Sequence, residues 1–269
     1  MPTDSPTDLY TLLPAQGEPL PIIANLPHSG IKVPPHIAQH FTQTQLATLP
    51  NSDWHLQPLY SFLPSLGISV LQANYSRYVV DLNREIKPPL FGSFWSAVVA
   101  EQTAFKKAIY TQKPTKAEVQ SRIEHYYTPY HQVLTGLLND AIAYHGQIYL
   151  LDLHSFMGLI TDDVCLGNGN GATCQENTLT IATDCLSQQG YQVVKNKVFT
   201  GGYITRHYGQ NPKIEAMQIE LRYPLYLPDD QLEVSTIPTW QSPKFDQAQA
   251  KLKTAIGHFI HQIMANGKA

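Results

Sequence analysis

The sequence has few cysteines, no surplus of positive charge and no long apolar run. Its three cysteines, with no CxxC spacing, exclude a Cys-only zinc site and argue against a disulfide scaffold. Lys and Arg total 18 against 21 Asp and Glu, a net charge of -3, so nucleic acid is not an expected partner. No apolar run approaches the ~20 residues that span a membrane. The N-terminus lacks signal-peptide regions, and we expect a cytoplasmic protein.

What is present indicates one large globular domain. Of the 269 residues, 43% are hydrophobic, enough for a substantial core. Predicted strands and helices alternate along the chain, which is typical of an α/β fold with a mixed, mostly parallel sheet and helices on both faces. We expect a polar lead-in over residues 1–19 and a single domain over residues 20–269.

The predicted elements follow from apolar runs, helical periodicity and turn residues. A helix over 116–144 should begin after a Thr115 cap, bend at Pro129 and stop at Gly146. Residues 85–113, rich in proline and aromatic residues, are expected to form a long loop over a site. The other predicted helices cover 36–41, 54–66, 176–188 and 245–264, and the predicted strands cover 21–26, 68–73, 78–82, 147–155, 163–167, 191–195 and 217–221.

The segment QIYLLDLHS at 147–155 indicates a buried strand that carries polar side chains at its C-terminal end. Asp152 and His154 are two residues apart, so both should point to the same face of the sheet. A histidine in this position suits a metal ligand, with Asp152 as a hydrogen-bonding support. A histidine bonded only to loop backbone is the alternative.

Other polar residues are predicted at the same edge of the sheet, where active sites of open α/β sheets lie. His28 follows one predicted strand, and Asp53 and His55 follow a loop. Two histidines and one carboxylate would make a zinc site with an open position. Asp53 is the better carboxylate, although it could equally be a helix cap.

Glu220 stands inside the apolar run MQIELRYPLYL, where burial without a partner would be costly. It could pair with Arg222, which strand alternation places on the same face. It could instead be a general base whose pKa burial raises toward neutrality.

Three arginines are candidates for binding anions. Arg77 and Arg84 flank a predicted strand. Arg206 lies in GGYITRHYG, on an expected loop whose two glycines let the backbone approach a ligand closely. Guanidinium groups bind carboxylates bidentately, so three of them indicate a substrate with more than one negative group. Each could instead form a structural ion pair.

These segments resemble a known family. DLHS, IELR and Asn83-Arg84 after strands are similar to motifs of the zinc carboxypeptidase superfamily, which includes aspartoacylase-type enzymes. The series PHSG, SDWH, SRYVVDLNRE, LLDLHSF, GGYITRHYG and QIELRYPLY, in this order between residues 20 and 228, more closely resembles the N-formylglutamate amidohydrolase (deformylase) family of histidine degradation.

The resemblance implies a phosphorylase/hydrolase-like fold and zinc-dependent hydrolysis of N-formyl-L-glutamate to formate and L-glutamate. His28 and His154 match the zinc histidines, and Glu220 matches the catalytic glutamate. The superfamily's second ligand would stand at position 31, where this chain has Ile31. Asp53 is the substitute, with His55 as the fallback. The remaining matches are Arg77 for polarising the scissile carbonyl and Asn83 and Arg84 for the substrate carboxylate, with Arg206 the candidate for the γ-carboxylate.

The implied mechanism uses one zinc ion, although other divalent metals are possible. The metal lowers the pKa of its water to roughly 7, and Glu220 acts as general base in the attack on the formyl carbonyl. The partner is a small N-acyl amino acid, and the chain should be a monomer or small homo-oligomer. Two alternatives remain: an amidohydrolase acting on another N-acyl amino acid or a peptide, and a non-catalytic metal- or ligand-binding homologue.

Overall fold

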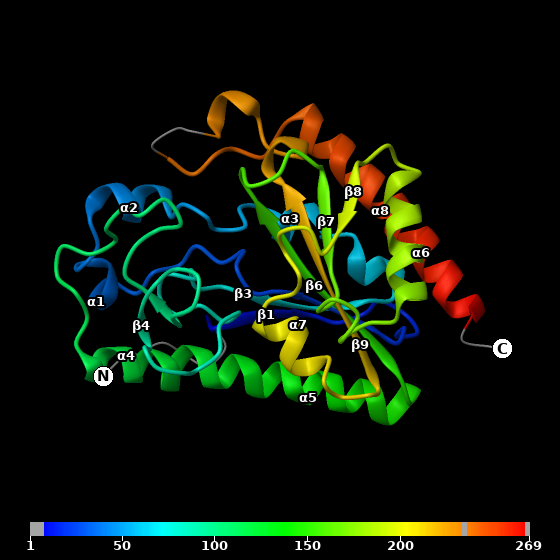
Figure 1. The fold of residues 1–269 in the computed structure, drawn as a ribbon, viewed down its shortest axis with the longest axis horizontal. Coiled ribbons are helices and arrows are strands. Elements are labelled where there is room, and N and C mark those ends of the chain that lie inside the picture. The colour runs from blue at the N-terminus through cyan, green and yellow to red at the C-terminus, as the bar shows by residue number, and fades with distance from the viewer. Residues whose placement is uncertain (1–7, 233–235, 267–269) are drawn as a thin grey trace.

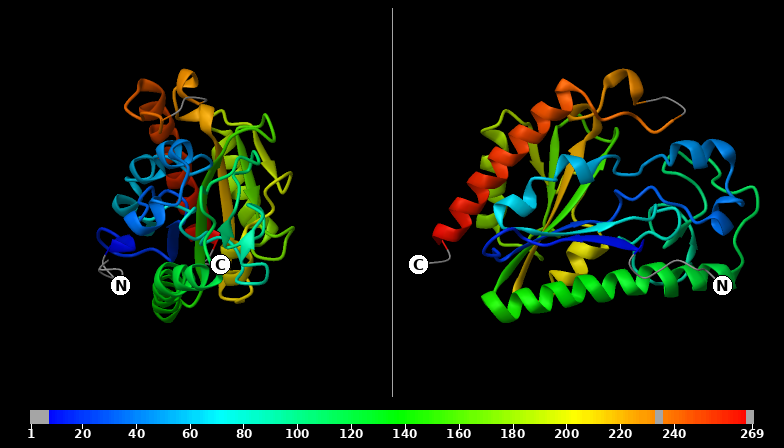
Figure 2. Two further views of the ribbon diagram at one scale, coloured as in Figure 1. Left: turned by 90° about the vertical axis from the view of Figure 1, so that its left-hand side faces the viewer. Right: turned by 180° about the vertical axis from the view of Figure 1, so that it is seen from behind.

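The computed structural model describes residues 8–232 and 236–266 as a sheet covered by helices on both faces (Figures 1 and 2). The strand order is β1-β3-β2-β6-β9-β7-β8. Strands β3, β2, β6 and β9 are parallel neighbours, as are β7 and β8, whereas β1 on β3 and β7 on β9 are antiparallel. The predicted α/β class with a mostly parallel sheet is confirmed. The strands are β1 (Tyr10–Leu13), β2 (Ile22–Leu26), β3 (Ser69–Ala73), β6 (Ile148–Phe156), β7 (Val164–Gly167), β8 (Val193–Lys195) and β9 (Ile214–Arg222).

Alternate residues of the central strands separate the core into two parts. Ile22, Leu151 and Met217 belong to one hydrophobic cluster, together with residues of α3, α6 and α8. Ile23 and Leu150, one residue away on the same strands, belong to the other cluster, with residues of α5 and α7. This alternation is what a sheet buried on both faces requires. The helices are α1 (Pro35–Ala38), α2 (Gln43–Thr48), α3 (Leu56–Leu59), α4 (Lys116–Arg122), α5 (Thr128–His145), α6 (Glu176–Ser187), α7 (Tyr203–Tyr208) and α8 (Pro243–Asn266).

The long helix predicted over 116–144 is present as α4 and α5 in line (Figure 1). Thr115 caps it with a full capping box, in which its hydroxyl accepts from the Glu118 N–H and Glu118 accepts from the Thr115 N–H. The irregularity lies before Pro129, as a π-helical turn over Ile123–Tyr127, and Pro129 itself is in the first turn of α5. Such turns absorb local strain without ending a helix.

Three expectations of secondary structure differ from the structure. The predicted strand over 78–82 is wrong: the Val79 N–H donates to the Ser76 carbonyl, and the segment runs as buried turns. Its apolar run reflects burial in the core rather than pairing in a sheet. The stretch expected as a polar lead-in includes β1, which pairs with β3, while residues 1–7 lie outside the described part of the chain. The segment of Arg206 forms the short helix α7 rather than a loop.

Residues 85–113 are largely irregular, as expected, with only the short pair β4 (Phe91–Gly92) and β5 (Val99–Ala100). Short 3-10 turns cover Leu63–Leu66, Tyr223–Leu225 and Asp229–Gln231. The helix expected over 54–66 is therefore short and broken, with Pro58 and Pro64 inside it.

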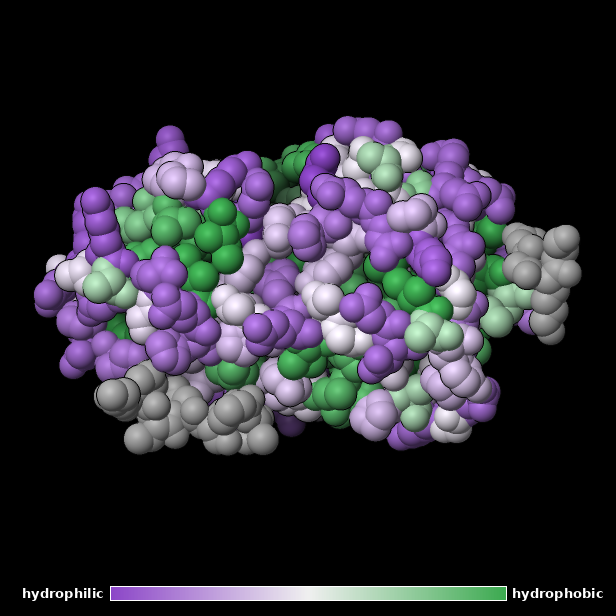
Figure 3. All heavy atoms as spheres, turned by 90° about the horizontal axis from the view of Figure 1, so that it is seen from below, coloured by the Kyte–Doolittle hydropathy of each residue, from purple (hydrophilic) through white to green (hydrophobic). Residues whose placement is uncertain are grey.

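The molecular surface is mixed in character. On the face seen from below, hydrophilic residues predominate and hydrophobic residues form separate patches (Figure 3). Within residues 8–232 and 236–266, we find no helix with the length and apolar content needed to cross a bilayer.

Candidate active site and metal centre

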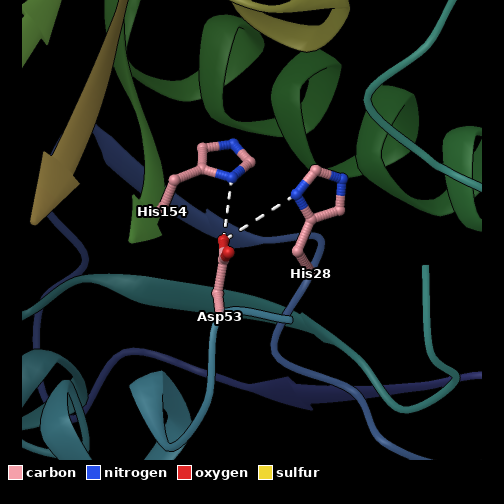
Figure 4. Close-up of side chains that lie close together, drawn as sticks. All are labelled: His28, Asp53 and His154. Carbon is pink, nitrogen blue, oxygen red and sulfur yellow. Dashed lines mark hydrogen bonds and ion pairs between the residues drawn. The ribbon is translucent and has the colours of Figure 1, made fainter. Parts of the chain in front are cut away.

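Three buried side chains meet where β2 and β6 end. His28 follows β2, His154 lies near the end of β6, and Asp53 comes from the loop before α3 (Figure 4). Asp53 Oδ2 is 2.9 Å from His154 Nδ1 and 3.8 Å from His28 Nδ1. The Asp53 N–H donates to the His28 carbonyl at 3.0 Å, which ties the two loops together. One atom from each residue lies within 4.8 Å of the others, so the predicted two-His, one-carboxylate group is present.

Each imidazole is oriented by a second carboxylate. His28 Nε2 lies 2.7 Å from Asp81 Oδ1, and His154 Nε2 lies 3.2 Å from Asp152 Oδ2. Both Nδ1 atoms therefore face Asp53. Carboxylate partners of this kind fix the tautomer and ring orientation of metal-binding histidines. Asp152 has the supporting position expected for it.

Asp152 is itself held by two further side chains, one of which is fixed by a third. One of its oxygens accepts from Asn25 Nδ2 at 2.9 Å, and the other accepts from the Thr205 hydroxyl at 3.1 Å. Tyr130 donates in turn to Asn25 Oδ1 at 2.6 Å. A fully bonded buried carboxylate keeps its position and charge, so His154 has a fixed partner.

The electrostatics of the group fit a divalent cation. Burial and the nearby Arg77 charge lower the pKa of His28 to about 4, so its imidazole is neutral at neutral pH. Burial lowers the pKa of His154, but Asp152 and Asp53 outweigh burial and hold that pKa well above its usual value. Two buried carboxylates beside one imidazole favour a positive charge there, either as an imidazolium or as a bound cation. Two nitrogens and one carboxylate oxygen are a donor set that Zn²⁺ prefers.

Glu220 lies beside this group because β6 and β9 pair in register, with His154 opposite Glu220. Gln218 Nε2 donates to Glu220 Oε1 at 2.6 Å, whereas Oε2 is buried without a partner. Burial raises the pKa of Glu220 to about 8, the range of a general base. Arg222 Nε is also buried without a hydrogen-bond partner, so it makes no bond to the free oxygen of Glu220, against the alternative pairing of these two residues.

Gln218 is a functional candidate that the sequence reasoning missed. Its Oε1 accepts from the Gly202 N–H while its amide nitrogen donates to Glu220. The signal was its spacing, because residues 218 and 220 point to the same face of β9.

Asp81 connects the metal group to the arginines, and it too was missed. Arg77 Nε and Nη2 donate to Asp81 Oδ2 at 3.2 and 2.6 Å, while Oδ1 faces His28. Burial would raise the pKa of Asp81, but Arg77, Arg84 and His28 together hold it well below its usual value. The sequence signal was the Asp-Leu-x spacing that DLNR shares with DLHS.

Arg84 and Asn83 also lie beside Asp81. Arg84 Nε and Nη2 donate to the Phe94 carbonyl at 3.2 and 3.1 Å. Asn83 Oδ1 accepts from the Ile204 N–H at 2.8 Å, and its Nδ2 lies 3.1 Å from His154 Nε2. Asn83 is therefore bonded to the start of α7 and packs beside the His154 ring.

A cavity of about 640 Å³ opens over this group. It brings together the predicted residues His28, Asp53, Arg77, Asn83, Arg84, His154 and Glu220. The segment 85–113 contributes Phe94, Trp95, Ala104 and Phe105 to its lining, as expected of a loop over the site.

Two candidates lie elsewhere. His55 is not with the two histidines; its Nε2 contacts the Pro238 carbonyl, so Asp53 takes the position for which His55 was the fallback. Arg206 does not line the cavity. Its guanidinium donates to the Gly201 carbonyl at 2.8 Å and to the Thr200 hydroxyl at 2.7 Å, and both of these residues do line it.

A buried His-Asp-His group that could hold a metal ion, with an adjacent glutamate, lies beyond the C-terminal ends of parallel strands, where the active sites of open α/β sheets are found. The model of the family described as N-formylglutamate amidohydrolase matches residues 20–227. The chain belongs to this family, as its motifs predicted.

Relatives agree with this assignment. The N-formylglutamate deformylase of Pseudomonas putida is 33% identical over 223 residues, covering 77% of this chain and 82% of that protein. The deformylase of Pseudomonas aeruginosa is 32% identical over 220 residues, with the same coverage of 77% and 82%. The crystal structure of N-formylglutamate amidohydrolase from Ralstonia eutropha superimposes with a TM-score of 0.79 at 25% identity, covering 95% of this chain and 99% of that one.

Proposed function

We propose that this chain hydrolyses N-formyl-L-glutamate to formate and L-glutamate with one divalent metal ion as cofactor. Zinc is the proposed metal. The observation that supports this most strongly is the buried His28–Asp53–His154 group beside the unpaired oxygen of Glu220. The proposed substrate is inferred from the two Pseudomonas relatives, which are named N-formylglutamate deformylases. Such an enzyme would act in the cytoplasm, on formylglutamate formed during histidine degradation.

The proposed metal ligands are His28 Nδ1, His154 Nδ1 and a carboxylate oxygen of Asp53. A bound zinc ion would supply Lewis-acid polarisation of the formyl carbonyl and of water. Asp81 and Asp152 keep the two imidazoles in the tautomer that presents Nδ1.

Glu220 is the proposed general base and acid. Its Oε2 accepts a proton from the attacking water and returns that proton to the leaving amine. Gln218 keeps the other oxygen occupied, so that the carboxylate presents Oε2 to the cavity. A carboxylate with a pKa raised by burial is suited to both steps.

Arg77 is the proposed donor to the scissile carbonyl oxygen. Its guanidinium contacts Asp81 and the Asn51 carbonyl and has further N–H groups to offer. A preorganised donor of this kind typically contributes about 3 kcal/mol to the transition state. Arg84, with Asn83 beside it, is the proposed site of the substrate α-carboxylate.

Arg206 has a different proposed role from the one for which it was the candidate in the sequence. Because its guanidinium is bonded to Thr200 and Gly201, we propose that it shapes the backbone that lines the cavity. Because Arg206 does not line the cavity, contact with a γ-carboxylate there would require its side chain to move.

The test is zinc content measured together with formate release from N-formyl-L-glutamate. Purified protein should contain about one metal per chain and release formate with many turnovers. Protein with full metal content and no release of formate would support the non-catalytic alternative instead.

A further inference from the structure

A second, smaller cavity of about 200 Å³ adjoins the main one, and we call it the side pocket. The residues that line both spaces are Asn51, Phe105, Met157 and Tyr223. Because these residues are shared, the two spaces lie side by side. Arg77 Nη1 donates to the Asn51 carbonyl at 3.0 Å. A substrate bound beside Arg77 therefore has the side pocket next to it.

The side pocket is lined by polar groups that lack partners. Gln45 and Trp54 line it, and both Gln45 Oε1 and Trp54 Nε1 are buried without a hydrogen-bond partner. The Trp54 side chain is only 6% exposed. Buried polar atoms are bonded in the great majority of cases, so we expect a polar occupant here. An indole N–H can only donate, which suits an acceptor such as a carboxylate oxygen.

Lys107 gives the side pocket a positive charge. Among the described residues that line this pocket, Lys107 is the only charged one. Its ammonium group makes no ion pair or hydrogen bond within the described part of the chain. Its backbone is fixed, because the Lys107 N–H donates to the Thr103 hydroxyl at 3.2 Å and its carbonyl accepts from the Thr103 N–H at 2.9 Å. A free ammonium group on a fixed backbone is available to an anion.

The arginines already described leave one carboxylate of the proposed substrate without a cation. Arg77 is assigned to the scissile carbonyl and Arg84 to the α-carboxylate. Both are also close to Asp81, with Nη2–Oδ2 distances of 2.6 and 3.9 Å, so part of their positive charge is already neutralised. Arg206 lines neither space. The γ-carboxylate therefore needs another cation, and Lys107 borders the neighbouring pocket.

We infer that the side pocket receives the γ-carboxylate of N-formyl-L-glutamate and that Lys107 selects for this charge. The inference rests on the proposed function, because it assigns the side-chain end of the same substrate. The methylene groups of the glutamate side chain would cross the shared lining, where Phe105 and Met157 are apolar. The Lys107 ammonium group would then pair with the γ-carboxylate through a charge-assisted hydrogen bond.

The experiment compares kcat/KM for N-formyl-L-glutamate and N-formyl-L-glutamine in zinc-loaded enzyme. The two compounds have nearly the same shape and differ in the charge of the side chain. The wild type should prefer formylglutamate by about 10-fold or more, the factor that a hydrogen bond to a charged group typically gives. In Lys107→Met this ratio should fall toward one, mainly through a higher KM for formylglutamate. Because a ratio is measured, a loss common to both substrates cancels.

Two variants serve as controls. Lys106→Met removes the same charge from the neighbouring residue, which lines neither space, so the ratio should not change. Lys107→Arg keeps a cation and should retain most of the preference. Equal losses in Lys106→Met and Lys107→Met would show a general effect of net charge and overturn the inference. A wild-type ratio near one, or a ratio that Lys107→Met leaves intact, would also overturn it while formylglutamate hydrolysis still stands.

Two further outcomes are decisive. A preference that is lost in Arg206→Ala and kept in Lys107→Met would assign the γ-carboxylate to Arg206 and overturn the inference. If neither compound is hydrolysed, the proposed function fails, and calorimetry with the same two compounds decides the side pocket separately. Tighter binding of formylglutamate than of formylglutamine, lost in Lys107→Met but not in Lys106→Met, would support the inference; equal binding would overturn it.

Discussion

Replacing Asp81 by asparagine tests whether one buried carboxylate holds the site together. Asp81 is 2% exposed and contacts His28 Nε2, two nitrogens of Arg77 and the Asn83 N–H. Asparagine keeps the shape and removes the charge, so Arg77 is left buried without its partner. Breaking a buried ion pair on one side typically costs about 3–5 kcal/mol of the free energy of unfolding.

In a chain of this size, each kcal/mol lost from the free energy of unfolding lowers Tm by roughly 2–4 °C. The Tm of the variant should therefore fall by about 6–20 °C. Thermal unfolding of the metal-free protein, followed by circular dichroism, measures this change. Asp229→Asn is the matched control, because Asp229 pairs with Lys244 at 2.8 Å on the surface with its side chain 72% exposed. Exposed pairs contribute little, and this variant should unfold as the wild type does.

The contribution of Asp81 to the free energy of unfolding depends on pH with a definite sign. Arg77 and its neighbours hold the pKa of Asp81 below its usual value, so the ionised carboxylate stabilises the folded state. This contribution is complete above the unfolded pKa of about 3.9 and is lost as pH falls through the lower folded pKa. The stability difference between wild type and Asp81→Asn should therefore be constant between about pH 5 and 8 and shrink below about pH 4. A variant as stable as the wild type at neutral pH, or a difference that persists undiminished in acid, would refute the reasoning.

Three further predictions concern the chemistry. Chelation should abolish formate release and zinc should restore it; full activity after verified metal removal would contradict the metal centre. Glu220→Gln should keep its zinc yet lose about 10²–10⁴-fold in kcat, because the general base is gone; near-normal kcat would place the base elsewhere. Arg206→Ala should lower kcat/KM for formylglutamate and formylalanine alike, since Arg206 acts through Thr200 and Gly201. A loss confined to formylglutamate would instead assign Arg206 to the γ-carboxylate.

The central strands could be predicted because burial on both faces leaves a plain signal. β6 and β9 are continuous apolar runs interrupted by functional polar residues, and the alternation of Asp152 with His154 was enough to orient both side chains. The same signal misled at residues 78–82, where an apolar run is buried in turns. β1 was missed because four residues with partly exposed side chains do not stand out from a polar stretch.

The metal group could be predicted in composition but not in its connections. His28, Asp53 and His154 were identified as residue types at strand ends. The bonds from Asp81 to His28 and Arg77 cross between segments that only folding brings together. The position of Arg206 depended on the helical turn after Gly202, which directs the guanidinium back onto its own loop.

The exposed apolar lining of the cavity could not be predicted for a related reason. Trp95 and Phe105 come from the segment 85–113, whereas Leu159 and Val198 come from loops after β6 and β8. Single exposed apolar residues carry no signal in a sequence. Only the fold shows that these four line one cavity.

The register of β6 against β9 sets the spacing between the proposed metal ligand His154 and the proposed base Glu220. His154 is opposite Glu220 and Asp152 is opposite Gln218, so each strand carries one proposed functional residue and one that bonds to it. Inserting or deleting a single residue within β9 before position 218 would turn the pair Gln218–Glu220 to the other face of the sheet. Changes of length in the segment 85–113 leave this spacing untouched. Exchange of this segment should therefore change the lining of the cavity while the spacing of His154 and Glu220 is kept by the sheet.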